Sequence, residues 1–366
     1  MSALMGQQES VVQSRSQAMT FEQKGMVSEA EQIWYGIAQA DPRDAEAFAH
    51  LGLLEARQEH YEAAIANYRQ AMSIDQDLPG LQINLGLALF KAAQFPGAIR
   101  CFSYELNKHP GDPRLITLLG MAHYGLKDYL VAIPYLRRIA ELDLKSAELR
   151  LTLAQSCLWS KQYECVLNVH KEILALNAES AEADMLAGEA LEQMQDGARA
   201  EKELRAAAVA NPNQPNVHFG LGYLFWLREA WPEATAEFQA ELENNPQHIK
   251  ARTYLADSWI RQNEFQKALT ELEKLGTSFG ANPLVAKDRG AIYVHDGRSE
   301  DALREFKIAI ESDPSDAEPH RQMANLYRSM GQTAEAGIED DQAKRFAQHK
   351  YPTLEEVIES IESPAP

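Results

Sequence analysis

The sequence has 366 residues, of which 45% are hydrophobic and 24% are charged, and its formal net charge at pH 7 is −19. A chain of this length exceeds one typical globular core, so we expect several domains or a repeat array. The negative charge argues against nucleic acid and anionic membrane surfaces as partners, because binders of phosphate backbones gain affinity from clustered Lys and Arg.

The N-terminal residues 1–10 have neither the basic start nor the apolar run of a secretory signal, so we interpret them as a short tail. The longest strongly apolar stretch, Phe219 to Leu227, is far shorter than the roughly 20 residues that span a bilayer. We therefore expect a soluble, cytoplasmic protein without membrane insertion. A periplasmic or exported location is the alternative if a signal peptide has been removed.

From position 18 onward, the sequence repeats with a period of 34 residues. One column of the repeat holds only Gly or Ala, and a second column, 12 residues further on, holds Ala in nine of ten cases. Gly and Ala together make up about a sixth of ordinary protein, so these columns are not chance. The first column is Ala18, Gly52, Gly86, Gly120, Ala154, Gly188, Gly222, Ala256, Gly290 and Ala324, and the second is Ala30, Ala64, Ala98, Ala132, Val166, Ala200, Ala234, Ala268, Ala302 and Ala336.

The apolar positions around these columns form two helical stripes, which predict a helix, a short turn and a second helix in each repeat. Small side chains are needed where two antiparallel helices cross closely, because a larger side chain would force the helices apart. Proline recurs at repeat ends, where it stops one helix and admits the next. These prolines are Pro42, Pro110, Pro212, Pro246 and Pro314.

This pattern of small, large and Pro positions resembles the tetratricopeptide repeat family. Ten consecutive repeats fit without an insertion, at 11–44, 45–78, 79–112, 113–146, 147–180, 181–214, 215–248, 249–282, 283–316 and 317–350. The resemblance implies an all-α fold, a right-handed superhelical solenoid of helix pairs. It also implies that the first helix of each repeat lines a concave groove, which binds a peptide or a helix of a partner protein.

Carried over by position, the resemblance implies a series of groove residues in chain order. They are Ile83, Asn84, Leu87 and Phe90 in the third repeat, Leu118, Met121 and Tyr124 in the fourth, Trp159 in the fifth, Phe219, Tyr223 and Trp226 in the seventh, and Tyr254 in the eighth. This face is turned about 100 degrees from the core stripe, so we expect these side chains to be surplus to the packing of each repeat and available as binding hot spots. The alternative is that they thicken the contacts between neighbouring repeats.

The sixth repeat places three carboxylates, Glu182, Glu189 and Glu192, at groove positions. Such a surface would attract Lys or Arg side chains of a ligand and steer its approach. The alternative is a solvated acidic face without a binding role.

After the tenth repeat, Thr353 and Glu356 form a capping box, and Leu354, Val357, Ile358 and Ile361 follow at helical spacing. We therefore predict that residues 351–366 form a capping helix and tail. A solenoid leaves the apolar face of its last repeat exposed, and such a helix would cover it. Docking of this helix on a partner is the alternative.

Catalytic and cofactor-binding motifs are missing from the sequence. It contains no HExxH, no P-loop and no GxGxxG at a strand-to-helix turn, and residues 276–280, which match GxSxG, lack the preceding strand pattern that this motif requires. The three cysteines, Cys101, Cys157 and Cys165, include no CxxC pair, so we expect buried free thiols and no metal site. The alternative is a redox pair of Cys157 and Cys165, which flank one turn in the fifth repeat. We expect no enzyme activity and no cofactor.

The sequence therefore predicts a non-catalytic scaffold or adaptor that binds a protein or peptide partner, with basic residues of that partner facing the glutamates. A self-assembling structural solenoid, and hence a homo-oligomer, is one alternative; the targeting part of a larger enzyme complex is another. The carboxylate clamp by which some family members capture chaperone C-termini is not expected, because only Arg321 and Asn325 match its pattern.

Overall fold

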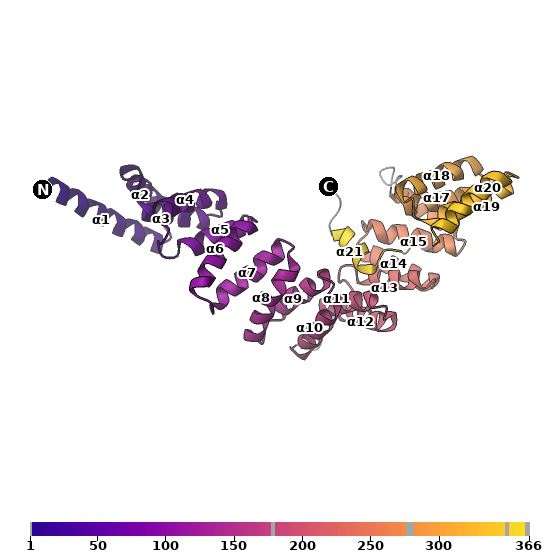
Figure 1. Ribbon diagram of the computed structural model, residues 1–366, viewed down its shortest axis with the longest axis horizontal. Coiled ribbons are helices and arrows are strands. Elements are labelled where there is room, and N and C mark those ends of the chain that lie inside the picture. Colours follow the sequence, from indigo (N-terminus) through magenta and orange to yellow (C-terminus); the bar gives the residue numbers. More distant parts are fainter. Residues whose placement is uncertain (1, 177–179, 276–281, 348–350, 363–366) are drawn as a thin grey trace. The chain divides into compact units, whose positions relative to one another are not determined.

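The computed structural model describes residues 2–176, 180–275, 282–347 and 351–362. These residues form 21 helices, and no strand occurs in the described ranges (Figure 1). The predicted all-α architecture of consecutive helix pairs is confirmed. The chain divides into two compact units, an N-terminal unit of residues 1–162 and a C-terminal unit of residues 163–366.

The N-terminal unit packs its helices in chain order, each against the next. Its helices are α1 (Ser2–Gln23), α2 (Val27–Ala40), α3 (Ala45–Arg57), α4 (Tyr61–Ile74), α5 (Leu81–Lys91), α6 (Phe95–Lys108), α7 (Pro113–Gly125), α8 (Tyr129–Leu142) and α9 (Ala147–Trp159). Because α1 begins at Ser2, the residues that we interpreted as a tail continue the first helix of the first repeat.

The C-terminal unit continues the same pattern and ends on a helix outside the repeats. Its helices are α10 (Tyr163–Leu176), α11 (Ala181–Gln193), α12 (Gly197–Ala210), α13 (Val217–Leu227), α14 (Trp231–Asn244), α15 (Ile249–Arg261), α16 (Phe265–Lys274), α17 (Pro283–His295), α18 (Ser299–Ser312), α19 (Ala317–Ser329), α20 (Thr333–Arg345) and α21 (Leu354–Glu362). Among the described helices, none combines the length and the apolar character that a bilayer crossing requires.

The small-residue column lies at the crossing of the two helices of each repeat, as predicted. A Cβ atom built on Gly52 of α3 would lie 2.7 Å from the Tyr68 ring of α4, and one on Gly222 of α13 would lie 2.7 Å from the Phe238 ring of α14. The aromatic ring of the second helix thus occupies the space that a side chain of the first would need. Glycine at these positions lets the two helices approach closely.

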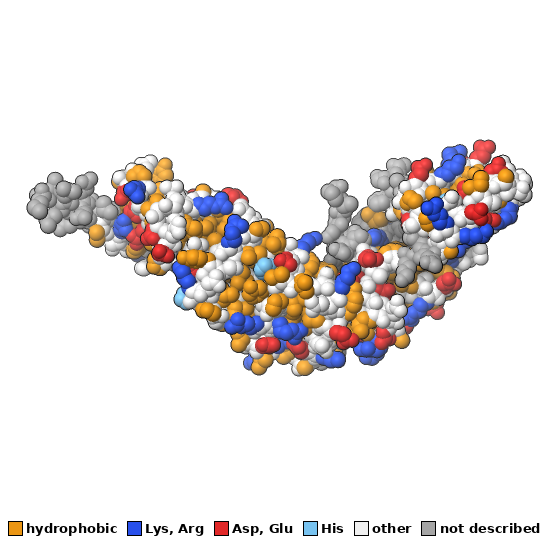
Figure 2. All heavy atoms as spheres, in the orientation of Figure 1, with side chains coloured by type: hydrophobic (Ala, Val, Ile, Leu, Met, Phe, Trp, Pro, Cys, Tyr) orange, Lys and Arg blue, Asp and Glu red, His pale blue; other side chains and the backbone are white. Residues whose placement is uncertain are grey.

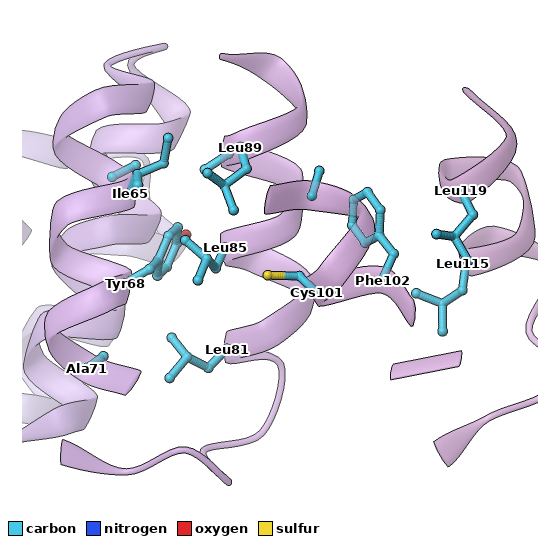
Figure 3. Close-up of a cluster of buried hydrophobic side chains, with 13 residues drawn as sticks. Ile65, Tyr68, Ala71, Leu81, Leu85, Leu89, Cys101, Phe102, Leu115 and Leu119 are labelled. Carbon is cyan, nitrogen blue, oxygen red and sulfur yellow. The ribbon is translucent and has the colours of Figure 1, made fainter. Parts of the chain in front are cut away.

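Between repeats, the core is a continuous row of apolar side chains. Figure 3 shows Tyr68 of α4, Leu85 of α5 and Cys101 of α6 directed toward one another, and all three are buried. Each repeat therefore buries its apolar stripes against the repeats before and after it, as expected for a repeat array.

The predicted C-terminal helix forms with its capping box, but it does not pack where we expected. The Thr353 N–H donates to Glu356 Oε2 at 3.0 Å, and the Glu356 N–H donates to Thr353 Oγ1 at 3.3 Å. Instead of covering the last pair, α19 and α20, the helix α21 packs against α11 and α13 (yellow in Figure 1). At the end of the array, α21 would contact the last repeat alone. In the observed position, its Leu354, Val357 and Ile358 side chains are almost completely buried.

Candidate functional site

The predicted groove residues of the N-terminal unit form a surface that is partly open. Ile83, Phe90 and Leu118 are half-buried and pack on the core between α4 and α7, whereas Leu87 is 37% exposed. Hydrophobic side chains gather over α6 to α9 on the face seen in Figure 2. In this unit, the chain does not bury its apolar side chains completely.

Tyr124 and Trp159 extend this surface from α7 to α9. Their ring centroids are 5.9 Å apart, and the Tyr129 ring of α8 lies 4.7 Å from Trp159. The Tyr124 O–H donates to Gln155 Oε1 at 2.7 Å, which holds the phenol against α9. Asn84 and Met121 are half-buried on α5 and α7. The structure thus brings these predicted residues onto adjacent first helices, and their role in binding stays a prediction.

The predicted groove residues of the C-terminal unit form one aromatic cluster, which is buried. Phe219 and Tyr223 are 0% exposed and Trp226 is 3% exposed. The Tyr254 ring lies 6.0 Å from Phe219, 5.2 Å from Tyr223 and 5.1 Å from Trp226. The expectation that these side chains are surplus to the packing of the chain is therefore wrong in this structure.

A segment from the far end of the chain, residues 351–358, covers part of this cluster; we call it the C-terminal segment. The Tyr351 ring lies 4.7 Å from the Trp226 ring and nearly perpendicular to it. The Tyr223 O–H donates to the carbonyl oxygen of Pro352. Sequence reasoning predicted the helix in this segment but not these contacts, because nothing in its repeat pattern indicates which surface it meets.

The acidic residues of α11 also meet the C-terminal segment. The Leu354 N–H at the start of α21 donates to Glu192 Oε2 at 3.3 Å. Burial raises the pKa of both Glu182 and Glu192, and Glu189 is buried. The three glutamates therefore do not form an open, fully solvated acidic face, and their attraction for a basic partner stays a prediction.

A cluster of buried charges lies beside Trp226 on the next two first helices, α15 and α17. The Trp226 Nε1–H donates to Asp257 Oδ2 at 2.7 Å, and Lys287 Nζ lies 3.3 Å from Asp257 Oδ1. Asp288 is also buried, and burial together with the neighbouring Asp257 raises its pKa well above the ordinary value. When Asp257 and Asp288 are both ionised, neither carboxylate can donate a hydrogen bond to the other, and Asp288 Oδ2 has no hydrogen-bond partner. A proton on Asp288 allows it to donate to Asp257, which removes the repulsion.

This charge cluster borders a cavity of about 370 Å³ between α15, α17 and α19. Arg261, Glu318 and Gln322 line the cavity together with the cluster. Glu318 accepts hydrogen bonds from Arg321 and Gln322, both at 2.9 Å, so its charge is already compensated. The lining combines these charged and amide side chains with apolar ones, including Ile260, Phe265 and Val294.

Within the described residues, one group has the composition of a metal site. The donor atoms of His170, Asp184 and Glu203 lie within 4.8 Å of one another. His170 Nε2 lies 2.7 Å from Asp184 Oδ1, so these two groups form a hydrogen bond without an ion. At the equivalent positions of three later repeats, a basic side chain faces a glutamate: His218 and Glu237, Arg252 and Glu271, and His320 and Glu339. In the sixth repeat Asp184 replaces the basic residue, and His170 is its hydrogen-bond partner.

The cysteines differ from what we expected. Cys101 is a free, buried thiol, and burial raises its pKa. Cys157 and Cys165 are disulfide-bonded. The expectation of free thiols is therefore right for Cys101 and wrong for the other two, which flank one turn of the fifth repeat as the alternative of a redox pair required.

Family models match three stretches of the chain. A TPR repeat model matches residues 52–92, and a tetratricopeptide repeat model matches residues 83–147 and 185–249. These ranges include α5, α7, α13 and most of α11, the helices that carry most of the surfaces described above.

Two curated proteins and one crystal structure illustrate the similarity. The chain is 25% identical over 156 residues to anaphase-promoting complex subunit 3 of Schizosaccharomyces pombe, which covers 43% of this chain and 24% of that protein. It is 22% identical over 248 residues to Hsp70-Hsp90 organizing protein 2 of Arabidopsis thaliana, which covers 64% of this chain and 42% of that protein. The crystal structure of a tetratricopeptide repeat protein from Parabacteroides merdae covers 67% of this chain and 96% of that one, with a TM-score of 0.49 and 18% identity. The chain thus spans less than half the length of these curated relatives.

Proposed function

Because the chain is a tetratricopeptide repeat protein, we propose that it is a non-catalytic scaffold that binds a peptide or helix of a partner protein on the first helices of its repeats. The observation that carries this proposal is the position of the C-terminal segment. On α11 and α13, the first helices of two repeats, the chain already holds an amphipathic helix from elsewhere in its sequence. A surface that holds one such helix has the shape and the apolar character to hold another.

The N-terminal unit offers the equivalent surface without a covering segment among the described residues. Ile83, Leu87 and Phe90 of α5 stand at the same repeat positions as Phe219, Tyr223 and Trp226 of α13. Together with Leu118 and Met121 of α7, they form what we call the α5–α7 surface. Burying partly exposed apolar side chains contributes about 25 cal/mol for each Å² removed from water, which offsets part of the entropic cost of association.

The partner that this surface favours has an apolar face bordered by basic residues. Apolar contacts with the α5–α7 surface would supply the affinity, as in other helix-in-groove complexes. The net charge of −19 would speed the approach of a basic partner, and added salt would slow it.

A photo-crosslinking residue at position 87 tests the proposal. In extracts of the source organism, we expect Leu87 replaced by a photo-crosslinking amino acid to capture a specific protein. The same residue at Leu142, which is 63% exposed on α8 outside the α5–α7 surface, should not capture it.

The identified partner then allows a quantitative test. Leu87→Asp should weaken its binding at least tenfold with little change in stability, because Leu87 is partly exposed, whereas Leu142→Asp should leave binding unchanged. Equal capture at both positions, or equal affinity of both variants, would contradict binding at the α5–α7 surface. Light scattering addresses the alternative: a mass that grows with concentration would favour a self-assembling solenoid.

A further inference from the structure

We propose that the C-terminal segment is an internal ligand of the surface formed by α11 and α13, and that a partner segment of the same chemistry displaces it. This inference rests on the proposed function, because it specifies the kind of segment that a first-helix surface of this chain accepts. It also makes access to that surface dependent on release of the internal segment.

The first argument is the location of the contacts. The segment meets residues that precede it by 129 to 192 positions in the chain, namely Tyr163, Glu192 and Tyr223. A cap of the last repeat would meet α19 and α20 instead. The segment therefore binds a surface formed by other repeats, as a separate peptide would.

The second argument is that the surface recognises backbone as well as side chains. Tyr223 donates its hydroxyl to the Pro352 carbonyl, and Glu192 accepts the Leu354 N–H, one of the amides at a helix start that lack a partner within the helix. Both contacts can be made by any peptide that begins a helix at this point. The Thr353–Glu356 capping box lies within the segment and prepares this helix start before docking.

The third argument is the apolar register. Leu354, Val357 and Ile358, at spacing i, i+3 and i+4, are the residues that α21 buries. Leu354 approaches Gly220 of α13, where an added Cβ would lie 3.7 Å from its methyl group. Tyr351 adds its ring to Trp226 before the helix begins. The segment that fits is therefore an aromatic residue, a helix cap, and then a helix with aliphatic residues in this register.

The electrostatic contacts indicate why the internal segment can be displaced. Glu355 and Glu356 approach a surface that already contains Glu192, and the charge of Glu356 contributes to the raised pKa of Glu192. Glu355 accepts from the Tyr163 hydroxyl at 3.3 Å, and burial together with Glu355 raises the pKa of Tyr163 to about 12. Repulsion between the like charges of Glu356 and Glu192 weakens the docking. A partner segment with a neutral or basic residue in place of Glu356 avoids this repulsion.

The length of α21 supports the same conclusion. A helix of nine residues is marginal in water by itself, so its order depends on the surface that it meets. Because the segment is covalently attached to the repeats, its local concentration is on the order of millimolar, which keeps even a weak contact occupied. A partner in solution must compete with the attached segment. Its apparent Kd equals its intrinsic Kd divided by the fraction of molecules in which the surface is open.

The experiment uses the full chain and a labelled peptide with the sequence of residues 351–362. In one variant, Leu354→Asp and Val357→Asp release the segment. The control, Ala206→Asp with Val209→Asp, introduces the same two charges at the same spacing on exposed positions of α12. In fluorescence anisotropy, the released variant should bind the peptide with a Kd at least tenfold lower than those of the wild type and the control. A peptide with Glu356→Gln, which preserves the capping box, should bind about two- to threefold more tightly than the natural peptide.

Hydrogen exchange confirms the state of each protein. In the released variant, amides 354–358 should exchange faster while those of α14 to α18 stay protected. If the double change also unfolds these helices, Tyr351→Ala provides the second test, because it removes the ring contact with Trp226, leaves the apolar residues of α21 unchanged and should still lower the peptide Kd several-fold.

Two results would overturn the inference: equal peptide affinity in the wild type and the released variant, or no peptide binding to a released variant whose repeats stay folded. Neither result affects crosslinking at Leu87, which tests the proposed function independently. Conversely, a failure to crosslink at Leu87 with successful peptide binding here would reject only the α5–α7 surface.

Discussion

His248 connects the stability of the C-terminal unit to pH through one buried imidazole. The side chain is 3% exposed at the start of α15, where Nδ1 accepts from the Ala251 N–H at 3.0 Å and Nε2 lies 3.0 Å from Asn216 Oδ1. Burial lowers the pKa of His248 to about 4. The folded protein therefore holds this ring neutral at pH values at which an unfolded chain, with a His pKa near 6.5, becomes protonated.

We predict that this histidine destabilises the folded chain as the pH falls from about 6.5 to about 4, because only the unfolded state gains the proton readily. The full effect is at most about 3 kcal/mol, at about 1.4 kcal/mol for each pKa unit. The neighbouring Glu241, whose pKa is raised by burial, acts in the opposite direction, so the effect must be isolated by substitution.

His248→Asn isolates it, since asparagine keeps an acceptor at the helix start but does not titrate. Urea unfolding between pH 4 and pH 7 should show a weaker pH dependence for this variant than for the wild type. Ser146→Asn, which exchanges one capping acceptor for another at α9, should give a curve parallel to the wild type. An unchanged slope in His248→Asn would show that the acid sensitivity arises elsewhere.

At the scale of the helix pair, the decisive feature is the close crossing of first and second helices. Gly222 of α13 faces the ring of Phe238 in α14, with no room for a methyl group. Gly36 of α2 is also within a helix, but a Cβ built there meets nothing within 4 Å. The two glycines share their backbone conformation and differ in what surrounds them.

We therefore expect opposite effects from the same substitution. Gly222→Ala should destabilise the chain by about 1–3 kcal/mol, as overpacked cores do, whereas Gly36→Ala should stabilise it by up to about 1 kcal/mol because alanine is the better helix former. Urea midpoints monitored by circular dichroism at 222 nm measure both. A shift of both variants in the same direction would mean that the crossing is not the reason for glycine at position 222.

The turns within the repeats show a second feature of these elements. The residue that follows the end of the first helix repeatedly adopts a positive φ, and it is glycine at Gly297 and Gly331 but not at Glu59, Ala93 or Lys127. This left-handed residue closes the helix, as when the His60 N–H donates to the Glu55 carbonyl at 3.0 Å. The repeat therefore imposes the turn even where the local sequence does not favour it.

At the scale of the whole molecule, each repeat meets mainly its neighbours, so stability should be local. We predict that Gly52→Leu, which places a large side chain against Tyr68, will increase hydrogen exchange in α3, α4 and the adjoining helices but not in α15 to α18. Gly290→Leu, against Phe306, should give the converse pattern. Hydrogen exchange detected by mass spectrometry measures the protection of each helix in both variants. Equal loss of protection along the whole chain in either variant would mean that all repeats unfold as one cooperative block.

The C-terminal segment is the exception to this locality, because it contacts repeats that are distant in the sequence. Glu192 accepts from the Leu354 N–H, and Tyr223 donates to the Pro352 carbonyl, so release of the segment affects α11 and α13 directly. The segment is one of two reasons why the predicted groove aromatics are buried. Tyr223 and Trp226 contact the C-terminal segment, whereas Phe219 packs against Phe238 of its own repeat and against Tyr254 of the next.

The sequence by itself determined the helix pairs, since the size of a side chain at each crossing acts between residues close in the chain and repeats every 34 positions. It also determined the capping box of α21, which is made by Thr353 and Glu356 alone. Only the tertiary structure decided where α21 docks, that Asp257 and Asp288 meet beside Trp226, and that Glu192 accepts the first amide of α21. These contacts depend on surfaces assembled from several repeats, and a periodic pattern specifies each repeat without specifying what a distant segment will find there.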